Sequence, residues 1–208
     1  MISILVANTK GGCGKTTLAT HIAAALAAAG HRTALADVDR QRSSLGWLER
    51  RPATAPAIRG LDWTREPGDP PAGLDRLVID APAALRGKEI EALVREADVI
   101  VLPVLPGAFD EGATLRFLGR IEELKPVRKG RKAVAVVGNR LRARTRSAER
   151  LDRFLAGVGH RVVARLRDSQ LYPDCAGTGL SLFDLPASRT RDARADWAPL
   201  LAFIEGEG

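Results

Sequence analysis

The sequence is poor in aromatic residues and cysteines, and it has no long hydrophobic run. Only 4% of its 208 residues are aromatic, so a core would consist mainly of Ala, Leu, Val and Ile. No apolar run approaches the roughly 20 residues that a membrane-spanning helix needs. The two cysteines, Cys13 and Cys175, have neither metal-ligand nor redox spacing. With no basic leader before the first apolar stretch, we expect a cytoplasmic protein.

Charge is what the sequence has in excess. The chain carries 32 Lys and Arg against 25 Asp and Glu, a net charge of +7, and its pI is near 10.1. This balance favours polyanionic partners such as nucleic acid, an anionic membrane surface or phosphates. An Arg-rich genome would give the same composition without such a partner, so charge alone leaves both explanations open.

Short apolar runs alternate with helix-like segments along the chain. The pattern predicts strands at residues 2–7, 33–36, 77–79, 99–102, 134–137 and 162–166. It predicts helices at residues 16–29, 88–96, 111–124, 147–155 and 192–204. Residues 51–73 are rich in Pro and Gly, with one edge strand expected at residues 57–63. We therefore expect a single α/β domain over residues 1–208, with a mostly parallel sheet covered by helices on both faces.

A glycine-rich segment follows the first expected strand and opens the first expected helix, which is the context of a phosphate-binding loop. Glycines let backbone N–H groups approach phosphate oxygens, and the helix adds its positive dipole end. We expect Lys15 to contact the β- and γ-phosphates, Thr16 to bind Mg²⁺ and Thr17 to contact the α-phosphate. The segment predicts binding and hydrolysis of ATP. Its residues are Lys10, Gly11, Gly12, Cys13, Gly14, Lys15, Thr16 and Thr17.

Carboxylates close two of the expected strands. Asp37 and Asp39 would point the same way if the second strand persisted through both, because side chains alternate along a strand. One of them could then orient a water molecule for attack on the γ-phosphate. Asp80 ends the strand at residues 77–79 and offers Mg²⁺ a hard oxygen ligand, through water.

The glycine-rich segment departs from the ordinary P-loop, because Thr9 stands where a glycine is usual and Lys10 precedes the glycine pair. This motif resembles the deviant Walker A box of the ParA/MinD family of ATPases. Residues 37–41 are similar to the family's Asp-x-Asp-Pro-Gln switch, with Arg40 in place of proline. Residues 77–82 are similar to its Walker B strand. The resemblance extends from residue 1 to about residue 186 and is closest to the small single-domain members.

The resemblance implies roles for individual residues. Lys10 would reach across to the partner's nucleotide in a homodimer that forms with ATP. Asp39 would orient the attacking water, and Asp37 would support the metal shell. Asn139 and Arg140 follow the strand at residues 134–137, where relatives contact the adenine ring. An Asn after a strand is also a common turn former, so that adenine contact has an ordinary alternative.

Arginines crowd the segment after residue 139. Arg146, Arg150 and Arg153 fall four and three residues apart, on one face of the expected helix. Arginine suits phosphate oxygens, and without a recognition helix we expect backbone contact with DNA of any sequence. The alternative is a solvated helix face with local ion pairs. The cluster consists of Arg140, Arg142, Arg144, Arg146, Arg150 and Arg153.

Taken with the resemblance, these features favour an ATPase that positions a plasmid, chromosome or protein assembly. ATP would close a homodimer on nonspecific DNA of the nucleoid, and a ParB-like or adaptor protein would stimulate hydrolysis and release. A metabolic ATP-dependent enzyme is one alternative, although residues 51–73 show no evident substrate ligands. A membrane-cycling ATPase like MinD is another, but the last expected helix has acidic flanks that anionic lipid repels. A redox ATPase would need clustered cysteines, which Cys175 alone cannot provide.

Overall fold

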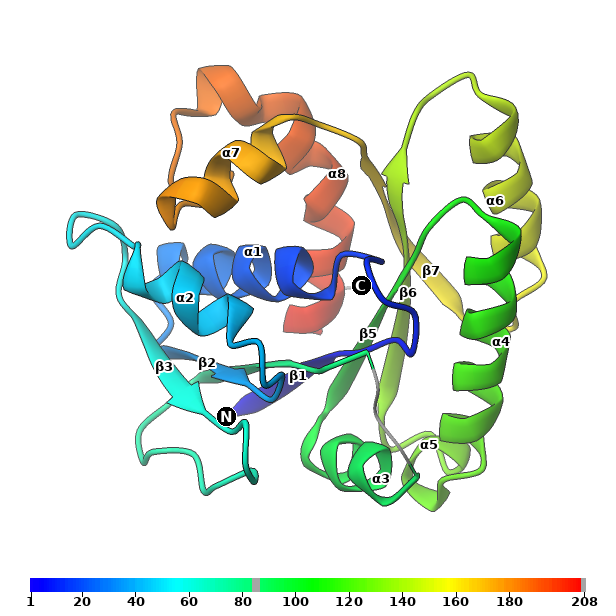
Figure 1. The fold of residues 1–208 in the computed structure, drawn as a ribbon, viewed down its shortest axis with the longest axis horizontal. Coiled ribbons are helices and arrows are strands. Elements are labelled where there is room, and N and C mark those ends of the chain that lie inside the picture. Colours follow the sequence, from blue (N-terminus) through cyan, green and yellow to red (C-terminus); the bar gives the residue numbers. More distant parts are fainter. Residues whose placement is uncertain (84–86, 207–208) are drawn as a thin grey trace.

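A parallel sheet forms the centre of the molecule (Figure 1). Within residues 1–83 and 87–206, which the computed structural model describes, the sheet has seven strands in the order β3-β2-β4-β1-β5-β6-β7. Every recorded strand pair is parallel. The strands are β1 (Ile2–Val6), β2 (Thr33–Asp37), β3 (Ile58–Asp62), β4 (Arg76–Asp80), β5 (Val99–Val104), β6 (Ala133–Leu141) and β7 (Arg161–Arg167).

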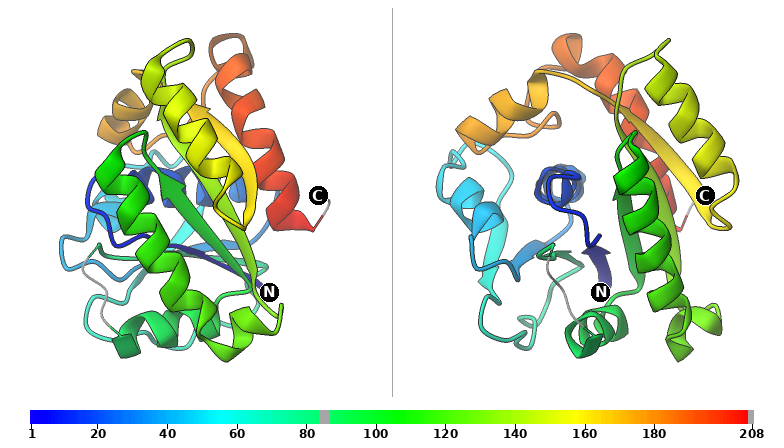
Figure 2. Two further views of the ribbon diagram at one scale, coloured as in Figure 1. Left: turned by 90° about the vertical axis from the view of Figure 1, so that its right-hand side faces the viewer. Right: turned by 45° about the vertical axis from the view of Figure 1, so that its right-hand side comes forward.

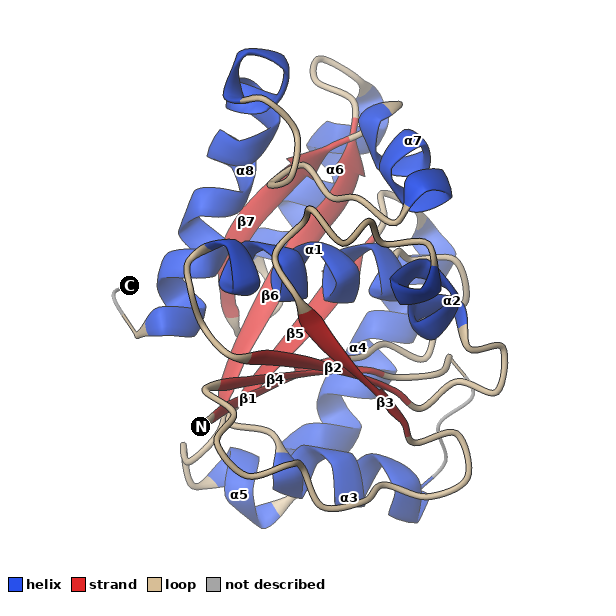
Figure 3. Ribbon diagram, turned by 90° about the vertical axis from the view of Figure 1, so that its left-hand side faces the viewer, coloured by secondary structure: helices blue, strands red, loops and turns tan. Residues whose placement is uncertain are grey.

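Helices cover both faces of this sheet (Figures 2 and 3). One face packs a largely aliphatic core against α3 (Gly87–Glu96), α4 (Ala108–Glu122), α5 (Lys125–Arg128) and α6 (Arg146–Ala156). The other packs against α1 (Lys15–Ala28), α2 (Ser43–Glu49), α7 (Leu171–Thr178) and α8 (Ala187–Glu205). The expected α/β fold with a parallel sheet covered on both faces is confirmed.

Several of the scarce aromatic side chains gather between α1, α7 and α8. His21 stacks on Trp197 with ring centroids 5.3 Å apart, and Tyr172 packs edge-on against His21. The indole N–H of Trp197 donates to the Tyr172 hydroxyl at 3.0 Å. Burial lowers the pKa of His21 to about 4, so the imidazole is neutral at physiological pH. This cluster fixes α7 beside α1, next to the loop that follows β1.

The element boundaries expected from sequence were wrong in four places. Helices α2, α5 and α7 were not anticipated, and α8 begins at Ala187 rather than residue 192. Strand β2 ends at Asp37, so the condition under which Asp37 and Asp39 would point the same way along one strand is not met. The edge strand expected in residues 57–63 is confirmed as β3, at one margin of the sheet. No helix in the described ranges is long and apolar enough to cross a membrane.

The strand order places the site. Strand β1 lies between β4 and β5. The next three strands in the chain, β2, β3 and β4, lie on one side of β1, and the last three, β5, β6 and β7, lie on the other. Parallel α/β sheets bind ligands at such a switch point, beyond the carboxyl ends of the strands. The carboxyl ends of β1, β2, β4 and β6 meet at that edge. The glycine-rich segment follows β1 and Asp39 follows β2, while Asp37 and Asp80 are the last residues of β2 and β4 and Asn139 lies near the end of β6.

Candidate functional site

The glycine-rich loop connects β1 to α1 and is held from two sides. Asn8 is buried, and its amide donates to the Pro103 carbonyl of β5 at 2.8 Å while accepting the backbone N–H of Lys10 at 3.1 Å. Across the loop, the amide of Asn139 donates to the Cys13 carbonyl at 2.8 Å. The loop conformation is therefore fixed by side chains of β6 and of the β1 end.

Two independent features of the loop require a glycine at position 14. Its φ is +96°, which side-chain-bearing residues rarely adopt. A Cβ built there would lie 2.3 Å from Nδ2 of Asn139. By contrast, a Cβ on Gly11 or Gly12 would meet no atom within 4 Å, and both glycines are exposed. The outer face of the loop is therefore open.

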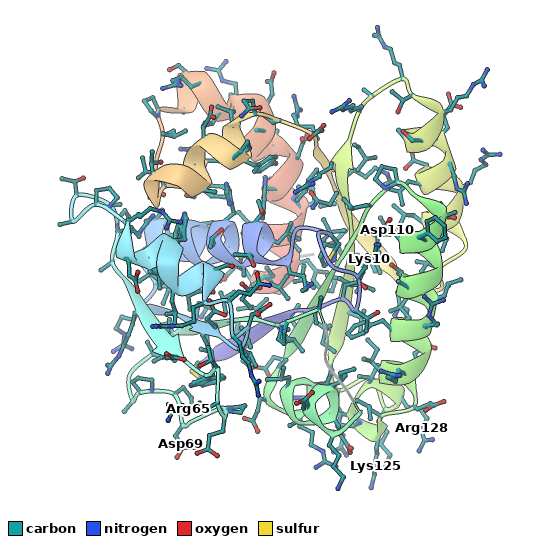
Figure 4. The ribbon with its side chains drawn as sticks, viewed as in Figure 1. Lys10, Arg65, Asp69, Asp110, Lys125 and Arg128 are labelled. Atoms are coloured by element: carbon teal, nitrogen blue, oxygen red, sulfur yellow. The ribbon has the colours of Figure 1, made fainter. Side chains whose placement is uncertain are left out.

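Lys15 points its ammonium group back over the loop. Its Nζ donates to the Lys10 carbonyl at 3.2 Å and lies 4.0 Å from the Cys13 sulfur. Only 8% of the residue is exposed, so this cation is held against the inner side of the glycine-rich loop. Burial raises the pKa of the Cys13 thiol, and the buried thiol leaves Cys13 only its backbone for ligand contact. Lys10 is partly exposed, at the start of the loop (Figure 4).

Asp80 is a buried carboxylate without a hydrogen-bond partner. It is 1% exposed, and neither of its oxygens has a partner among the described residues. Its pKa is raised to about 7, mainly by burial and also by the charge of the nearby Asp37, against the opposing effects of Thr16, Lys15 and Ser44. An orphaned carboxylate beside a threonine hydroxyl and a lysine is a donor set that fits Mg²⁺ with a bound phosphate.

Asp37 and Asp39 stand in different surroundings from Asp80. Asp37 is fully buried, and its Oδ2 accepts the backbone N–H groups of Ser44 and Leu45 at 2.9 and 3.1 Å. Its Oδ1 accepts the N–H of Asp39 at 3.0 Å. Asp39 is partly exposed and accepts the N–H of Gln41 at 3.0 Å. The two carboxylates are thus related by a turn after β2, not by strand alternation.

A pocket of about 710 Å³ opens beside the loop. It is large enough for a base and ribose, since ligand pockets span roughly 300–1,000 Å³. Thr17, Asn139 and Arg140 lie in its wall, so the structure brings these three predicted residues together. The remaining lining residues come mainly from the β7–α7 segment: Arg142, Asp168, Ser169, Gln170, Tyr172, Pro173 and Ala176.

Comparison with known proteins decides what this site belongs to. The profile of the CobQ/CobB/MinD/ParA nucleotide-binding domain matches residues 4–182, which include every element of the site described above. The chain belongs to this family. It is an ATPase of the ParA/MinD group, as the glycine-rich loop indicated.

Relatives by sequence include carboxysome distribution proteins and chromosome partitioning proteins. The maintenance of carboxysome distribution protein A of Halothiobacillus neapolitanus is 31% identical over 193 residues, 89% of this chain and 88% of that protein. A Cyanothece McdA structure, solved with ATP, covers 100% of this chain and 97% of its own at 15% identity, with a TM-score of 0.70. The structure of Aquifex aeolicus MinD matches 100% of this chain and 98% of its own chain at 17% identity, with a TM-score of 0.75. These two structural likenesses support the fold.

Two members of the arginine cluster, Arg140 and Arg142, line this pocket, and the others lie in the loop after β6 and along α6. Arg142 forms an ion pair with Asp168 at 2.7 Å, and Arg150 forms one with Glu111 at 2.8 Å. Local ion pairs therefore account for two members of the cluster. The other four, Arg140, Arg144, Arg146 and Arg153, are exposed and form no ion pair within the described residues.

Sequence reasoning missed the residues that hold the site together. Asn8 gave one signal, a polar residue between an apolar strand and a glycine-rich loop. Trp47 and Arg51 gave none, because their partners lie more than 100 residues away in the chain. Their contacts became visible only once α7 was placed beside α2.

Proposed function

We propose that this chain is a positioning ATPase that works as an ATP-bound homodimer on DNA. The observation that carries the proposal is the open outer face of the loop. Gly11 and Gly12 have free space where a Cβ would stand, and Lys10 lies at the same face, whereas Lys15, Asp80 and Asp37 are buried behind it. A second copy stacked on this face would complete the site and exclude water.

Within one subunit, we propose the following roles, which the burial and contacts of these residues support. Lys15 and the loop N–H groups hold the β- and γ-phosphates, and Thr17 contacts the α-phosphate. Thr16 and Asp80 hold Mg²⁺, Asp80 through water, with Asp37 behind them. When bound, Mg²⁺ neutralises charge on the phosphate oxygens. Asp39 orients the water that attacks the γ-phosphorus, and ADP leaves. Asn139 and Arg140 face the base.

Across the dimer, Lys10 would reach the partner's nucleotide. Lys15→Ala should therefore fail to bind nucleotide, while Lys10→Ala should bind it and stay monomeric. Asp39→Ala should bind ATP without turnover and accumulate as a dimer. Size-exclusion chromatography with ATP and Mg²⁺, alongside phosphate release, tests all three. A monomeric Asp39→Ala protein, or one with wild-type turnover, would contradict the proposal.

Gly11 gives a cleaner steric test of the dimer than Gly12. Gly12 has a φ of +75°, so Gly12→Val strains the loop as well as filling the interface, whereas Gly11 has no positive φ and open space around it. Gly11→Val should retain nucleotide binding by the monomer and lose ATP-dependent dimerisation. A dimeric, active Gly11→Val protein would mean that the loop faces solvent.

For the DNA surface, we propose the four arginines without ion pairs as the binding set. Replacing Arg144 and Arg146 by Glu should weaken binding to all duplex sequences alike and flatten the log–log salt slope by about 0.9 for each phosphate that is no longer neutralised. Dimerisation should persist. Arg116 and Arg120, exposed on α4, provide a matched double replacement that should leave the slope unchanged. If both double variants behave like wild type, DNA binding uses another surface, such as residues 128–132.

The cargo is proposed from the sequence relative. The Halothiobacillus protein is named for carboxysome distribution, so we infer that this chain positions a protein assembly and is released from DNA by an adaptor protein that stimulates hydrolysis. A plasmid or chromosome is the alternative cargo. Imaging the tagged chain in its host, with and without Lys15→Ala, would show which structure loses its regular placement.

A further inference from the structure

Helix α2 joins two parts of the site that are far apart in the chain. At its start, the N–H groups of Ser44 and Leu45 bind the carboxylate of Asp37. Asp37 in turn accepts the N–H of Asp39. At its other end, α2 lies against α7, whose residues Tyr172, Pro173 and Ala176 line the base pocket. The helix therefore spans from the switch carboxylates to the pocket wall.

Three neighbouring side chains fasten α2 to α7 and the segment after it. The indole N–H of Trp47 donates to the Leu180 carbonyl at 3.1 Å. The guanidinium of Arg50 donates to the Ala176 carbonyl at 3.2 Å. Arg51 donates to the Gly179 carbonyl at 3.1 Å and stacks over the Trp47 ring at 5.1 Å. These interactions fix the distance between the two helices.

The central interaction is a buried, two-pronged ion pair. Arg51 reaches Asp184 through Nη2 to Oδ1 at 2.7 Å and Nη1 to Oδ2 at 2.9 Å, with the two side chains 5% and 3% exposed. Burial opposes the charge on Asp184, but hydrogen bonds from Arg51 and Ser181 outweigh it and hold the pKa below its usual value. A bidentate pair fixes orientation as well as distance.

The backbones also touch at this point. Gly179 ends α7 with a φ of +69°, and a Cβ there would lie 2.4 Å from the backbone nitrogen of Arg51. Neither Arg51 nor Asp184 lines the base pocket. Any effect of the pair on catalysis must therefore pass through the helices that it joins, α2 and α7.

We propose that the Arg51–Asp184 pair positions Asp39 for hydrolysis by holding α2 between the wall of the base pocket and the switch. A base seated against α7 then fixes α2, and α2 fixes the turn that carries Asp39. Arg51 and Asp184 are positioning residues, and the inference rests on the proposed role of Asp39 in orienting water.

The test replaces both partners together, as Arg51→Met with Asp184→Leu, because removing one alone leaves a buried unpaired charge. We expect turnover of ATP to fall about 10- to 100-fold, since small misplacements of catalytic groups have effects of this size. The dissociation constant for ADP should stay within about 2-fold of wild type, because the phosphate loop is untouched. The exposed pair Arg32 and Asp75, replaced in the same way, is the matched control and should leave turnover unchanged.

Hydrogen exchange supplies a readout that a purely structural pair would not move. In wild type, ADP should slow exchange at the amides of residues 14–17 and also at Ser44 and Leu45. In the double variant, the first effect should remain and the second should disappear. Arg51→Lys, which keeps the charge without the fork, should recover part of both turnover and α2 protection, and it carries the same test if the double variant does not fold.

The outcomes separate this inference from the proposed function. Wild-type turnover and α2 protection in the double variant would overturn the positioning role while leaving Asp39→Ala inactive. Equal losses of ADP affinity and turnover would show a structural pair only, which also overturns it. Wild-type turnover in Asp39→Ala would instead remove the proposed role of Asp39 itself.

Discussion

Asp37 and Asp80 sit side by side in the sheet as register partners at the ends of β2 and β4, yet their surroundings are opposite. Both are buried. Asp37 accepts three backbone N–H groups, whereas neither oxygen of Asp80 has a partner in the described ranges. The first carboxylate is satisfied by the protein, and the second is left without a partner, as the proposed binding of Mg²⁺ requires. Equal residue type and equal burial therefore do not imply equal roles.

The largest effect is expected from Asp37→Ala. Three N–H groups at the start of α2 and in the turn after β2 would lose a charged acceptor, and each such loss costs roughly 1–3 kcal/mol. We expect the free energy of unfolding to fall by about 5 kcal/mol, as measured by urea denaturation without nucleotide. A loss below about 1 kcal/mol would mean that water replaces the carboxylate and that the contrast with Asp80 is overstated.

Ionised Asp80 should destabilise the folded protein, whereas Asp37 stabilises it, and the effect of Asp80 should depend on pH. Its folded-state pKa is about 7, against 3.8 as a free side chain, so the folded state holds a proton that the unfolded chain releases. The contribution of Asp80 to stability is then highest below about pH 4, falls as the pH rises through 7, and amounts to about 4 kcal/mol at most.

Asp80→Asn is the comparison that isolates this effect. In Asp80→Asn, the free energy of unfolding should not show the fall with rising pH that the Asp80 carboxyl causes. Without metal or nucleotide, the variant should therefore be more stable than wild type at about pH 8. Urea titrations of both proteins in EDTA between about pH 5 and pH 8 measure the difference. Parallel curves would show that a water molecule or a side chain satisfies the Asp80 carboxylate in solution.

The smallest effect is expected from Ser44→Ala. Asp37 binds the backbone N–H of Ser44, while the Ser44 hydroxyl is buried without a partner in the described part of the chain. Removing that hydroxyl should change stability by less than about 1 kcal/mol, because its interaction with the Asp80 carboxyl is weak and no well-formed hydrogen bond is broken. Thermal unfolding of the variant beside Asp37→Ala checks this. A destabilisation as large as that of Asp37→Ala would show that the Ser44 hydroxyl, not its backbone N–H, stabilises the start of α2.

The fold class and the glycine-rich loop could be predicted from the sequence because both depend on local patterns. The apolar runs before residues 10, 37 and 80 marked the strand ends, and the glycine-lysine pattern marked the phosphate loop. The difference between Asp37 and Asp80 was not predictable, because it depends on where α2 starts. Residues 43–49 form a helix whose first N–H groups bind the carboxylate of Asp37, at the end of the preceding strand, and the hydrophobic pattern does not mark this helix. For the same reason the Arg51–Asp184 pair, 133 residues apart in the chain, was invisible.

Because Asn139 packs against Gly14, the substitutions that each of these two positions can accept depend on the residue at the other. As long as position 139 carries an amide that reaches the Cys13 carbonyl, position 14 can tolerate nothing larger than hydrogen. A drift at either position would have to wait for a matching change at the other. The interior of the phosphate loop is therefore constrained from β6, whereas Gly11 on its outer face is free to diverge unless another molecule covers it.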